Sequence, residues 1–224
     1  MRRGATLRVE ELRVDAQEGR RLLHVPRLDV AAGEFVCVAG PSGAGKSTLL
    51  FALAGLLERA SGLASWNGMN LIAMSERARV AFRGERIGLV FQDFLLFDEL
   101  GALDNAALGG RWRVAGERRE IEERARDLLT CFGLDPEERR AVEHRSGGER
   151  QRIAVARALA ADPIALLADE PTASLDRAAA DRLVETFREI AATRRCTLIA
   201  VSHDPAMHAA ADRLVTISDG ILER

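Results

Sequence analysis

The chain has 224 residues, with 32 Lys or Arg against 34 Asp or Glu, which is a formal net charge of −2 at pH 7. This length predicts one domain of ordinary core size, and the charge balance gives no net basic field for nucleic acid. No apolar stretch of about 18 residues occurs, so we expect no bilayer span. The basic start at residues 1–4 leads into charged residues rather than an apolar core, which excludes a signal peptide. We therefore expect a cytoplasmic chain.

Short alternating apolar runs over residues 5–35, broken at Gly19 and at 32–33, predict an antiparallel β-lobe. From about 92 to 145 the pattern becomes helical, most clearly at 117–132, where apolar residues recur at helical spacing between charges that we expect to form a solvated face. Strands are predicted for the apolar runs at 34–39, 63–66, 87–91, 164–168 and 197–201, and a helix for 47–54. This alternation predicts an α/β fold, a parallel sheet with a helical insert between its halves.

The cysteine residues could be metal ligands and the tryptophan residues could contact a ligand, but their sequence context favours structural roles. Cys37 and Cys196 lie in strand-like apolar runs and form no C-x-x-C pair with each other or with Cys131. We expect buried thiols in a reducing compartment rather than metal ligands. Trp66, in a predicted strand, is expected to pack in the core. Trp112 lies between two arginines, and a half-buried surface position and a partner contact both remain open for it.

A glycine-rich motif at residues 40–48 is the most informative stretch of the chain. It reads GPSGAGKST and fits G-x-x-x-x-G-K-[ST] between a predicted strand and a predicted helix, which makes a chance glycine turn the weaker interpretation. The glycines let backbone amides face a phosphate, and the helix N-terminus adds partial positive charge. Lys46 is expected at the β- and γ-phosphates, and Ser47 at Mg²⁺. The predicted nucleotide-binding residues are Gly40, Pro41, Ser42, Gly43, Ala44, Gly45, Lys46, Ser47 and Thr48.

Polar residues follow three predicted strands at the edge where ligands of parallel sheets gather. Asp169 is placed to hold Mg²⁺ through a water, and Glu170 to polarise the water that attacks the γ-phosphate, although two acids after a strand can also simply be solvated. Gln92 offers an amide oxygen to Mg²⁺ or to water. A lone His at a strand end is usually structural, but His203 is placed to contact the γ-phosphate and orient that water. The predicted catalytic residues are Glu170, His203 and Gln92, and the predicted metal ligands are Ser47, Gln92 and Asp169.

A second anion site is predicted at residues 145–159. Ser146, Gly147 and Gly148 stand directly before a predicted helix, whose N-terminus attracts negative charge. A single nucleotide does not need two phosphate-binding sites in one chain. The economical explanation is that this second site closes over the nucleotide of another subunit.

In this order, the residues resemble the ATP-binding-cassette (ABC) ATPases over essentially the whole chain. The resemblance rests on the phosphate loop, Gln92, the SGGE signature at 146–149, the acids at 169–170, the SLD loop at 174–176, and His203. It implies a P-loop NTPase (RecA-like) core with an N-terminal antiparallel β-lobe and an inserted α-helical subdomain. The single ABC ATPase domain would span 1–224, with 1–91 and 146–224 as lobe and core and about 92–145 as the helical subdomain.

The resemblance also implies ATP and Mg²⁺ as cofactors and a head-to-tail dimer with a second copy of the chain or a paralogous cassette. Ser146, Gly147 and Gly148 would complete the ATP site of the opposite chain, and Glu149 and Asp176 join the expected nucleotide-binding residues. Closure on ATP and opening after hydrolysis would drive an integral-membrane permease, which would hold the chain on the cytoplasmic face of the inner membrane. No nucleic acid partner is expected.

A narrower resemblance rests on residues 75–83, 87–92, 94–96 and 102–105, which look like those of the lipoprotein-release and macrolide-export group of ABC ATPases. Members of that group work with four-span permeases. Amino-acid-importer and cell-division ATPases share parts of this pattern, so an importer-type subunit stays open as an alternative.

The chain departs from the ABC pattern at two places. Arg145 stands where the signature usually has Leu, so we expect it to turn outward or to pair with Glu143 or Glu149. The chain has no Tyr and no aromatic residue before Phe35, although the family normally stacks adenine on an upstream aromatic. Loss of a stack worth roughly 0.5–1.5 kcal/mol would weaken base affinity by about tenfold at most. Arg13 over the base is a possible substitute.

The sequence thus predicts an ABC-type ATPase subunit that powers a separately encoded permease. The rival from another class is an ABC ATPase with soluble partners, of the iron–sulfur assembly kind. DNA-repair members carry long coiled coils and ribosomal members carry two cassettes, whereas this chain has one phosphate loop and a short insert. A regulatory cassette that binds ATP and barely hydrolyses it is a third reading, which Arg145 keeps open.

Overall fold

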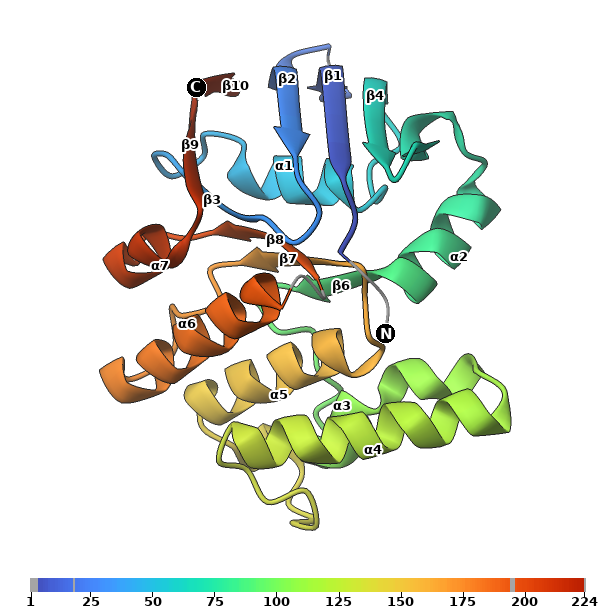
Figure 1. The fold of residues 1–224 in the computed structure, drawn as a ribbon, viewed down its shortest axis with the longest axis vertical. Helices are drawn as coiled ribbons and strands as arrows, with labels where there is room; N and C mark the ends of the chain where they lie inside the picture. Colours follow the sequence, from blue (N-terminus) through green and yellow to red (C-terminus); the bar gives the residue numbers. More distant parts are fainter. Residues whose placement is uncertain (1–3, 18, 194–195, 224) are drawn as a thin grey trace.

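The computed structural model describes residues 4–17, 19–193 and 196–223, so the basic start at 1–3 lies outside the described residues. These residues form a ten-stranded sheet in the order β5-β4-β1-β2-β10-β9-β3-β8-β7-β6. The sheet has an antiparallel part and a parallel part. Of the antiparallel part, β1, β2 and β4 are seen at the top of Figure 1; of the parallel part, β6, β7 and β8 cross its middle.

The first part is antiparallel and carries the start of the chain. β1 (Leu7–Asp15) pairs antiparallel with β2 (Arg21–Val30) on one side and with β4 (Ala60–Trp66) on the other, and β4 pairs with the short β5 (Met69–Asn70). Buried residues alternate with exposed ones along β1, as in a strand with one face on a core. The predicted antiparallel β-lobe is therefore confirmed.

The second part is parallel and forms the centre of the fold. β3 (Phe35–Ala39) lies between β9 (Arg213–Ser218) and β8 (Thr197–Val201), followed by β7 (Ala165–Asp169) and β6 (Ile87–Val90). All residues of β7 and β8 are buried, which explains why both strands are apolar apart from Asp169 at the end of β7 and Thr197 at the start of β8. β10 (Ile221–Glu223) pairs antiparallel with β9 and parallel with β2, and so joins the two parts.

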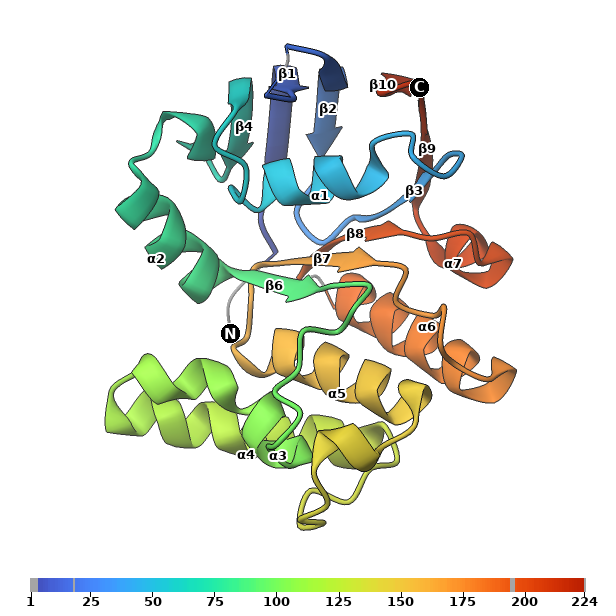
Figure 2. The ribbon, with the colours of Figure 1, turned by 180° about the vertical axis from the view of Figure 1, so that it is seen from behind.

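Helices cover both faces of the parallel strands, which confirms the predicted α/β fold (Figures 1 and 2). On one face, Val36 and Val38 of β3 pack in a core shared with α1 (Lys46–Leu53) and the β-lobe. On the other, Phe35 and Cys37 pack in a core built with helices that lie in the lower half of Figure 1. The alternation within one strand divides its side chains between the two cores.

The remaining helices follow in chain order. Between β5 and β6 lie η1 (Leu71–Ala73) and α2 (Glu76–Arg86). Between β6 and β7 lie α3 (Ala102–Ala106), η2 (Leu108–Trp112), α4 (Ala115–Cys131), η3 (Val142–His144) and α5 (Gly147–Ala160). α6 (Arg177–Ala192) and α7 (Pro205–Ala210) flank β8. The helix predicted over 117–132 is thus α4, displaced by one or two residues.

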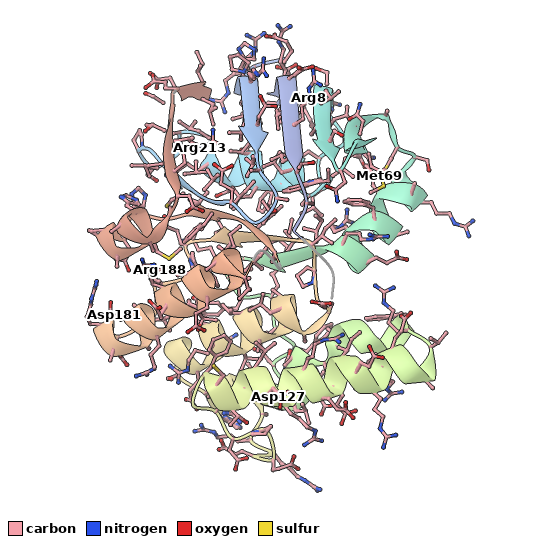
Figure 3. All side chains as sticks on the ribbon, in the orientation of Figure 1. Arg8, Met69, Asp127, Asp181, Arg188 and Arg213 are labelled. Atoms are coloured by element: carbon pink, nitrogen blue, oxygen red, sulfur yellow. The ribbon has the colours of Figure 1, made fainter. Side chains whose placement is uncertain are left out.

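Side-chain burial agrees with the structural roles expected for Trp66 and for two of the cysteines. Trp66 is fully buried and donates its Nε1–H to the Leu53 carbonyl at 2.9 Å. Trp112 is 79% exposed, so the half-buried position considered for it is wrong. Cys37 and Cys196 are buried free thiols. The exposed Asp127 of α4 lies at the periphery of the molecule, as a solvated helix face requires (Figure 3). Within the described ranges, no helix is long and apolar enough to cross a membrane.

Candidate functional site

The glycine-rich motif forms the loop between β3 and α1, and two of its glycines have no substitute. Gly40 has a φ of 146° and Gly45 a φ of 101°, both in the left-handed region that favours glycine. A Cβ on Gly40 would lie 2.1 Å from the Ile217 carbonyl oxygen, and one on Gly45 would lie 2.9 Å from the Leu22 carbonyl oxygen. The neighbouring backbone therefore imposes glycine at both ends of the loop.

Lys46 begins α1 and turns its ammonium group back into the loop. Only 8% of this residue is exposed, and its Nζ donates to the carbonyl oxygens of Gly40 and Pro41, both at 2.8 Å. No side chain caps the N-terminus of α1, so its free backbone N–H groups remain available to an anion. The loop thus combines a fixed positive charge with a helix N-terminus.

A cavity of about 530 Å³ opens over this loop at the carboxyl edge of the parallel strands, where ligands of α/β sheets gather. It brings together ten of the residues predicted from the sequence: Ser42, Gly43, Gly45, Lys46, Ser47, Thr48, Gln92, Asp169, Glu170 and His203. Leu22, Ala173 and Val201 also line it and were missed, because nothing in their local sequence distinguishes them from core positions. The lining does not include Gly40, Pro41 or Ala44. The carbonyl oxygens of Gly40 and Pro41 instead accept hydrogen bonds from Lys46.

Glu170 and His203 meet on one side of the cavity. Glu170 has a left-handed φ of 47°, and its N–H donates to the Val201 carbonyl at 2.9 Å, which fixes it just beyond the end of β7. Its Oε2 accepts the backbone N–H of His203 at 3.4 Å, and its Oε1 lies 3.5 Å from His203 Nε2. The His203 side chain is 59% exposed, so its ring remains accessible while its backbone is held by the carboxylate.

The oxygen donors of the cavity suit a magnesium ion. Ser47 brings a hydroxyl, Gln92 an amide and Asp169 a carboxylate to the same cavity, and hard oxygen ligands of this kind are those that Mg²⁺ prefers. The residues seen in the structure contain no cluster of three or more His, Cys, Asp or Glu that would hold a metal alone. The donor set therefore fits an ion that shares its coordination with a bound phosphate.

The second predicted anion site lies outside this cavity. Ser146 is the N-cap of α5, and it forms a capping box with Glu149: Ser146 Oγ accepts the Glu149 N–H at 3.2 Å, and Glu149 Oε2 accepts the Ser146 N–H at 2.9 Å. Ser146 and Gly147 are exposed. Asp176 also lies away from the cavity and caps α6 by accepting the Ala179 N–H at 2.8 Å. The structure thus keeps these predicted residues apart from the chain's own phosphate loop.

Arg145 does not turn outward. Its side chain has no exposed surface and pairs with Glu149 at 3.3 Å and with Glu138 at 3.2 Å. The expected pairing with Glu149 is therefore confirmed, whereas Glu143 lies next to His144 instead. Glu138 was missed, because it belongs to an irregular segment between α4 and η3 whose position no periodicity reveals.

The β-lobe side of the cavity offers an aliphatic rather than an aromatic surface. Leu22 of β2 lines the cavity, and none of its lining residues is aromatic. Arg13, considered as a substitute for the missing aromatic, pairs with Glu11 at 2.6 Å and does not line the cavity. The described residues that line the cavity therefore offer no aromatic surface on which a base could stack.

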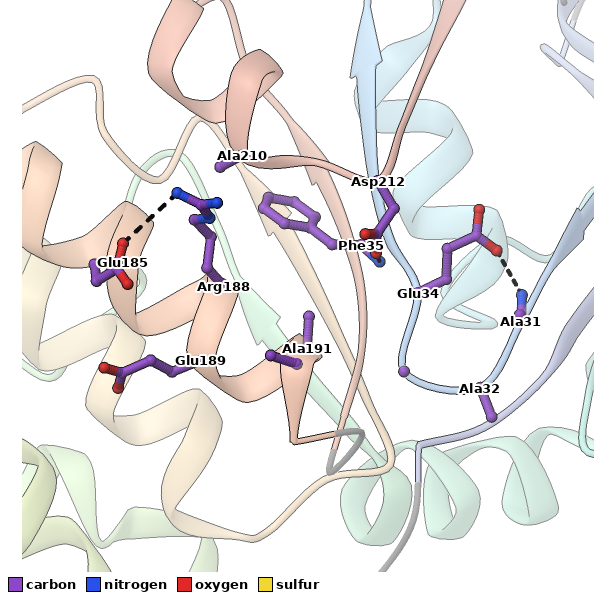
Figure 4. Close-up of a pocket in the computed structure, with 12 residues that line it drawn as sticks. Ala31, Ala32, Glu34, Phe35, Glu185, Arg188, Glu189, Ala191, Ala210 and Asp212 are labelled. Carbon is purple, nitrogen blue, oxygen red and sulfur yellow. Dashed lines mark hydrogen bonds and ion pairs between the residues drawn. The ribbon is translucent and has the colours of Figure 1, made fainter.

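A larger hollow, of about 740 Å³, lies at the amino ends of β3 and β9 and beside α6 (Figure 4). Most of its charged side chains are already engaged: Glu34 and Asp212 each accept a backbone N–H, at 2.6 and 2.9 Å, and Arg188 lies 3.9 Å from Glu185. Among the described residues that line it, Glu189 alone is left, which is no set of converging polar groups. We therefore assign the candidate site to the smaller cavity over the phosphate loop.

Comparison with known proteins agrees with this assignment. A family model described as ABC transporter matches residues 23–173. The chain is 37% identical over 214 residues to the lipoprotein-releasing system ATP-binding protein LolD 1 of Caulobacter vibrioides, covering 96% of this chain and 92% of that relative. It is 43% identical over 203 residues to the Fe(3+) ions import ATP-binding protein FbpC of Streptomyces coelicolor, covering 90% of this chain and 56% of that relative. A dimeric, post-hydrolysis structure of the ATP-binding cassette MJ0796 bound to ADP and Pi has a TM-score of 0.88 at 29% identity, over 97% of each chain.

Proposed function

The chain belongs to the ABC transporter family and is an ATPase, and from this premise we propose that it closes head to tail on ATP to drive a separate membrane permease. One observation carries the proposal. A single chain presents two helix N-termini suited to a phosphate, one at a cavity lined by the predicted catalytic residues and one exposed at the start of α5. The second site has no nucleotide to bind unless another chain supplies it.

Within the cavity, each predicted residue has a chemical role. Lys46 and the loop amides hold the β- and γ-phosphates, and Ser47, Gln92 and Asp169 are the ligands of Mg²⁺, which neutralises phosphate charge when bound. Glu170 polarises the attacking water and His203 orients it. Catalysis of this type depends mainly on positioning and charge stabilisation.

The exposed signature completes the site of the opposite chain. Ser146, Gly147 and Gly148 present a hydroxyl and the N-terminus of a helix of 14 residues to solvent, which together suit a γ-phosphate. Glu149 and Asp176 anchor this surface as caps of α5 and α6. The partner is a second copy of the chain or a paralogous cassette, and the dimeric MJ0796 structures support this arrangement.

The loop after Gln92 suits a contact with the permease. Leu95 and Phe97 are 57% and 51% exposed, and they lie in the loop that follows Gln92, which lines the nucleotide cavity. We assign residues of about 92–145 to a helical subdomain within one domain of 1–224, positioned to pass motion from nucleotide to permease. The likeness to the lipoprotein-releasing relative supports a partner of the export kind, for which we propose a four-span permease that holds the chain on the cytoplasmic face of the inner membrane.

A second candidate is an importer, since the identity to the iron-import relative is slightly higher over a similar length. The two are separated by the permease that the chain binds. We would add ATP and a tagged E170Q variant to detergent-solubilised native membranes, with a K46A/E170Q double variant as the matched control. A four-span permease captured only with intact Lys46 supports the export reading. A permease with more spans and a binding protein supports the importer, and only soluble partners would contradict both.

A further inference from the structure

Four charged side chains form a closed ring of ion pairs at the N-terminus of α5, the helix that begins after Ser146. Arg145 contacts Glu138 at 3.2 Å and Glu149 at 3.3 Å, and Arg140 contacts the same two carboxylates at 3.0 and 2.5 Å. Positive and negative groups therefore alternate around the ring, and each arginine bridges both acids. Arg145 is its buried member, with no exposed side-chain surface.

The stability of the fold does not by itself explain why an arginine is buried at position 145. Burying a guanidinium costs free energy that its ion pairs do not always recover, and the Nε of Arg145 is buried without a hydrogen-bond partner among the described residues. An apolar side chain would fill the same space without leaving a donor unsatisfied. The charge at this position therefore needs a role beyond filling the core.

Glu149 connects the ring to the signature serine. Its Oε1 lies toward Arg140 and Arg145, whereas its Oε2 accepts the N–H of Ser146 at 2.9 Å and the hydroxyl of Ser146 at 3.0 Å. Burial works against the ionised carboxyl, but the bonds from Ser146 and the charges of the two arginines outweigh it and lower the pKa of Glu149. The ring thus holds the carboxylate that orients Ser146.

We propose that Arg145 is a positioning residue for Ser146, acting through Glu149: the charges of Arg145 and Glu149 balance each other, and this balance leaves the signature serine able to meet the partner's nucleotide. The inference rests on the composite site proposed above. A hydroxyl has one proton, which Ser146 directs to Glu149 in this structure and which a phosphate in the partner would have to attract. Arg145 and Arg140 draw electron density from Glu149 and so weaken its hold on that proton.

The ring predicts how its members respond to substitution. R145L leaves the Glu149 carboxylate with Arg140 as its one cationic partner in the ring, so the carboxylate holds the Ser146 hydroxyl more strongly. E149Q leaves Arg145 buried with one carboxylate instead of two. R145L/E149Q removes both charges and leaves the Arg140–Glu138 pair, at 3.0 Å, in place. Partners in one charge network are expected to be coupled, so the double variant should recover what the single variants lose.

The test measures ATP-driven dimerisation by analytical ultracentrifugation, with every variant built on E170Q. We expect the dimer dissociation constant to rise about tenfold for E149Q and by a smaller factor for R145L, and to return close to the parent value for R145L/E149Q. R119L/E123Q, which removes an exposed ion pair of 3.7 Å on α4, is the matched control and should dimerise like the parent.

Two further measurements separate an effect on positioning from an effect on folding. The first is the affinity of dilute monomer for a fluorescent ATP analogue, and the second is the midpoint temperature of thermal unfolding. Unchanged monomer affinity with weakened dimerisation, rescued in the double variant, supports the proposal. Single variants that dimerise like the parent, or a double variant no better than E149Q, would overturn it while leaving the composite site intact. An E170Q parent that stays monomeric with ATP would remove the composite site, and this inference with it.

Discussion

Arg157 of α5 holds the loop after Gln92 in a strained conformation, and its removal should be measurable in both stability and activity. Its Nη1 donates to the Leu95 carbonyl at 2.5 Å and its Nη2 to the Phe94 carbonyl at 2.6 Å. Phe94 and Leu95 have φ values of 61° and 49°, a conformation that costs non-glycine residues about 1–3 kcal/mol each. The two hydrogen bonds offset that strain. Burial of the Arg157 guanidinium also lowers its pKa.

R157M keeps an extended side chain and removes both bonds. Hydrogen bonds from a charged donor contribute about 1.5–3 kcal/mol each. Part of this is recovered, because the variant no longer buries a charge and the loop is free to relax. We expect a net loss of about 2–3 kcal/mol in the free energy of unfolding. The relaxed loop would no longer hold Gln92 in the cavity, so kcat should fall more than ATP affinity.

Urea unfolding and steady-state ATP hydrolysis test this prediction, with R150M as the matched control. Arg150 also reaches this loop, at 3.0 Å from Asp98 and 5.8 Å above the Phe94 ring, but such contacts contribute about 1 kcal/mol or less. The reasoning is refuted if R157M is no less stable than R150M. It is also refuted if R157M loses stability but keeps the full turnover of the native chain.

Two further predictions concern the phosphate loop and the thiols. G40A would place a Cβ 2.1 Å from the Ile217 carbonyl oxygen, whereas a Cβ on Gly43, which also has a positive φ of 77°, meets nothing within 4 Å. Calorimetry should therefore show ATP affinity falling about tenfold further for G40A than for G43A, and equal affinities would disprove the steric argument. Iodoacetamide should alkylate the exposed Cys131 in the folded protein and spare Cys37, whose pKa is raised to about 12 by burial and by the charge of Glu170, since only the thiolate reacts. Mass spectrometry after labelling at pH 9 reads this out, and equal labelling of the two would count against the buried position.

Local pattern was enough to predict the core of the fold. The run 197–201 is a strand over the predicted residues because a central parallel strand is apolar on both faces. The rule that polar residues gather at the carboxyl ends of such strands then placed Gln92, Asp169, Glu170 and His203 around one cavity, although up to 111 residues separate them in the chain. The boundaries of α4 differ by one or two residues, within the ordinary ambiguity of helix ends.

Contacts between distant irregular segments could not be predicted in this way. Arg157 supports a turn more than 60 residues away, and the left-handed conformation of Phe94 and Leu95 contradicts their side-chain types, which normally avoid it. Glu138 reaches Arg145 from a segment with no periodicity. Leu22 joins the cavity only because β2 folds back against the phosphate loop. In each case tertiary packing determines the contact, and no short-range signal records it.

In the proposed dimer, each ATP is held by the phosphate loop of one chain and the signature of another. Mixing two inactive chains tests this sharing of sites: K46A with an intact signature, and S146R with an intact loop. Equal amounts should regain roughly a quarter of native ATPase activity, because half the dimers then hold one complete site of two in a twofold assembly. A mixture as inactive as its components, or an S146R chain that is active alone, would contradict the claim.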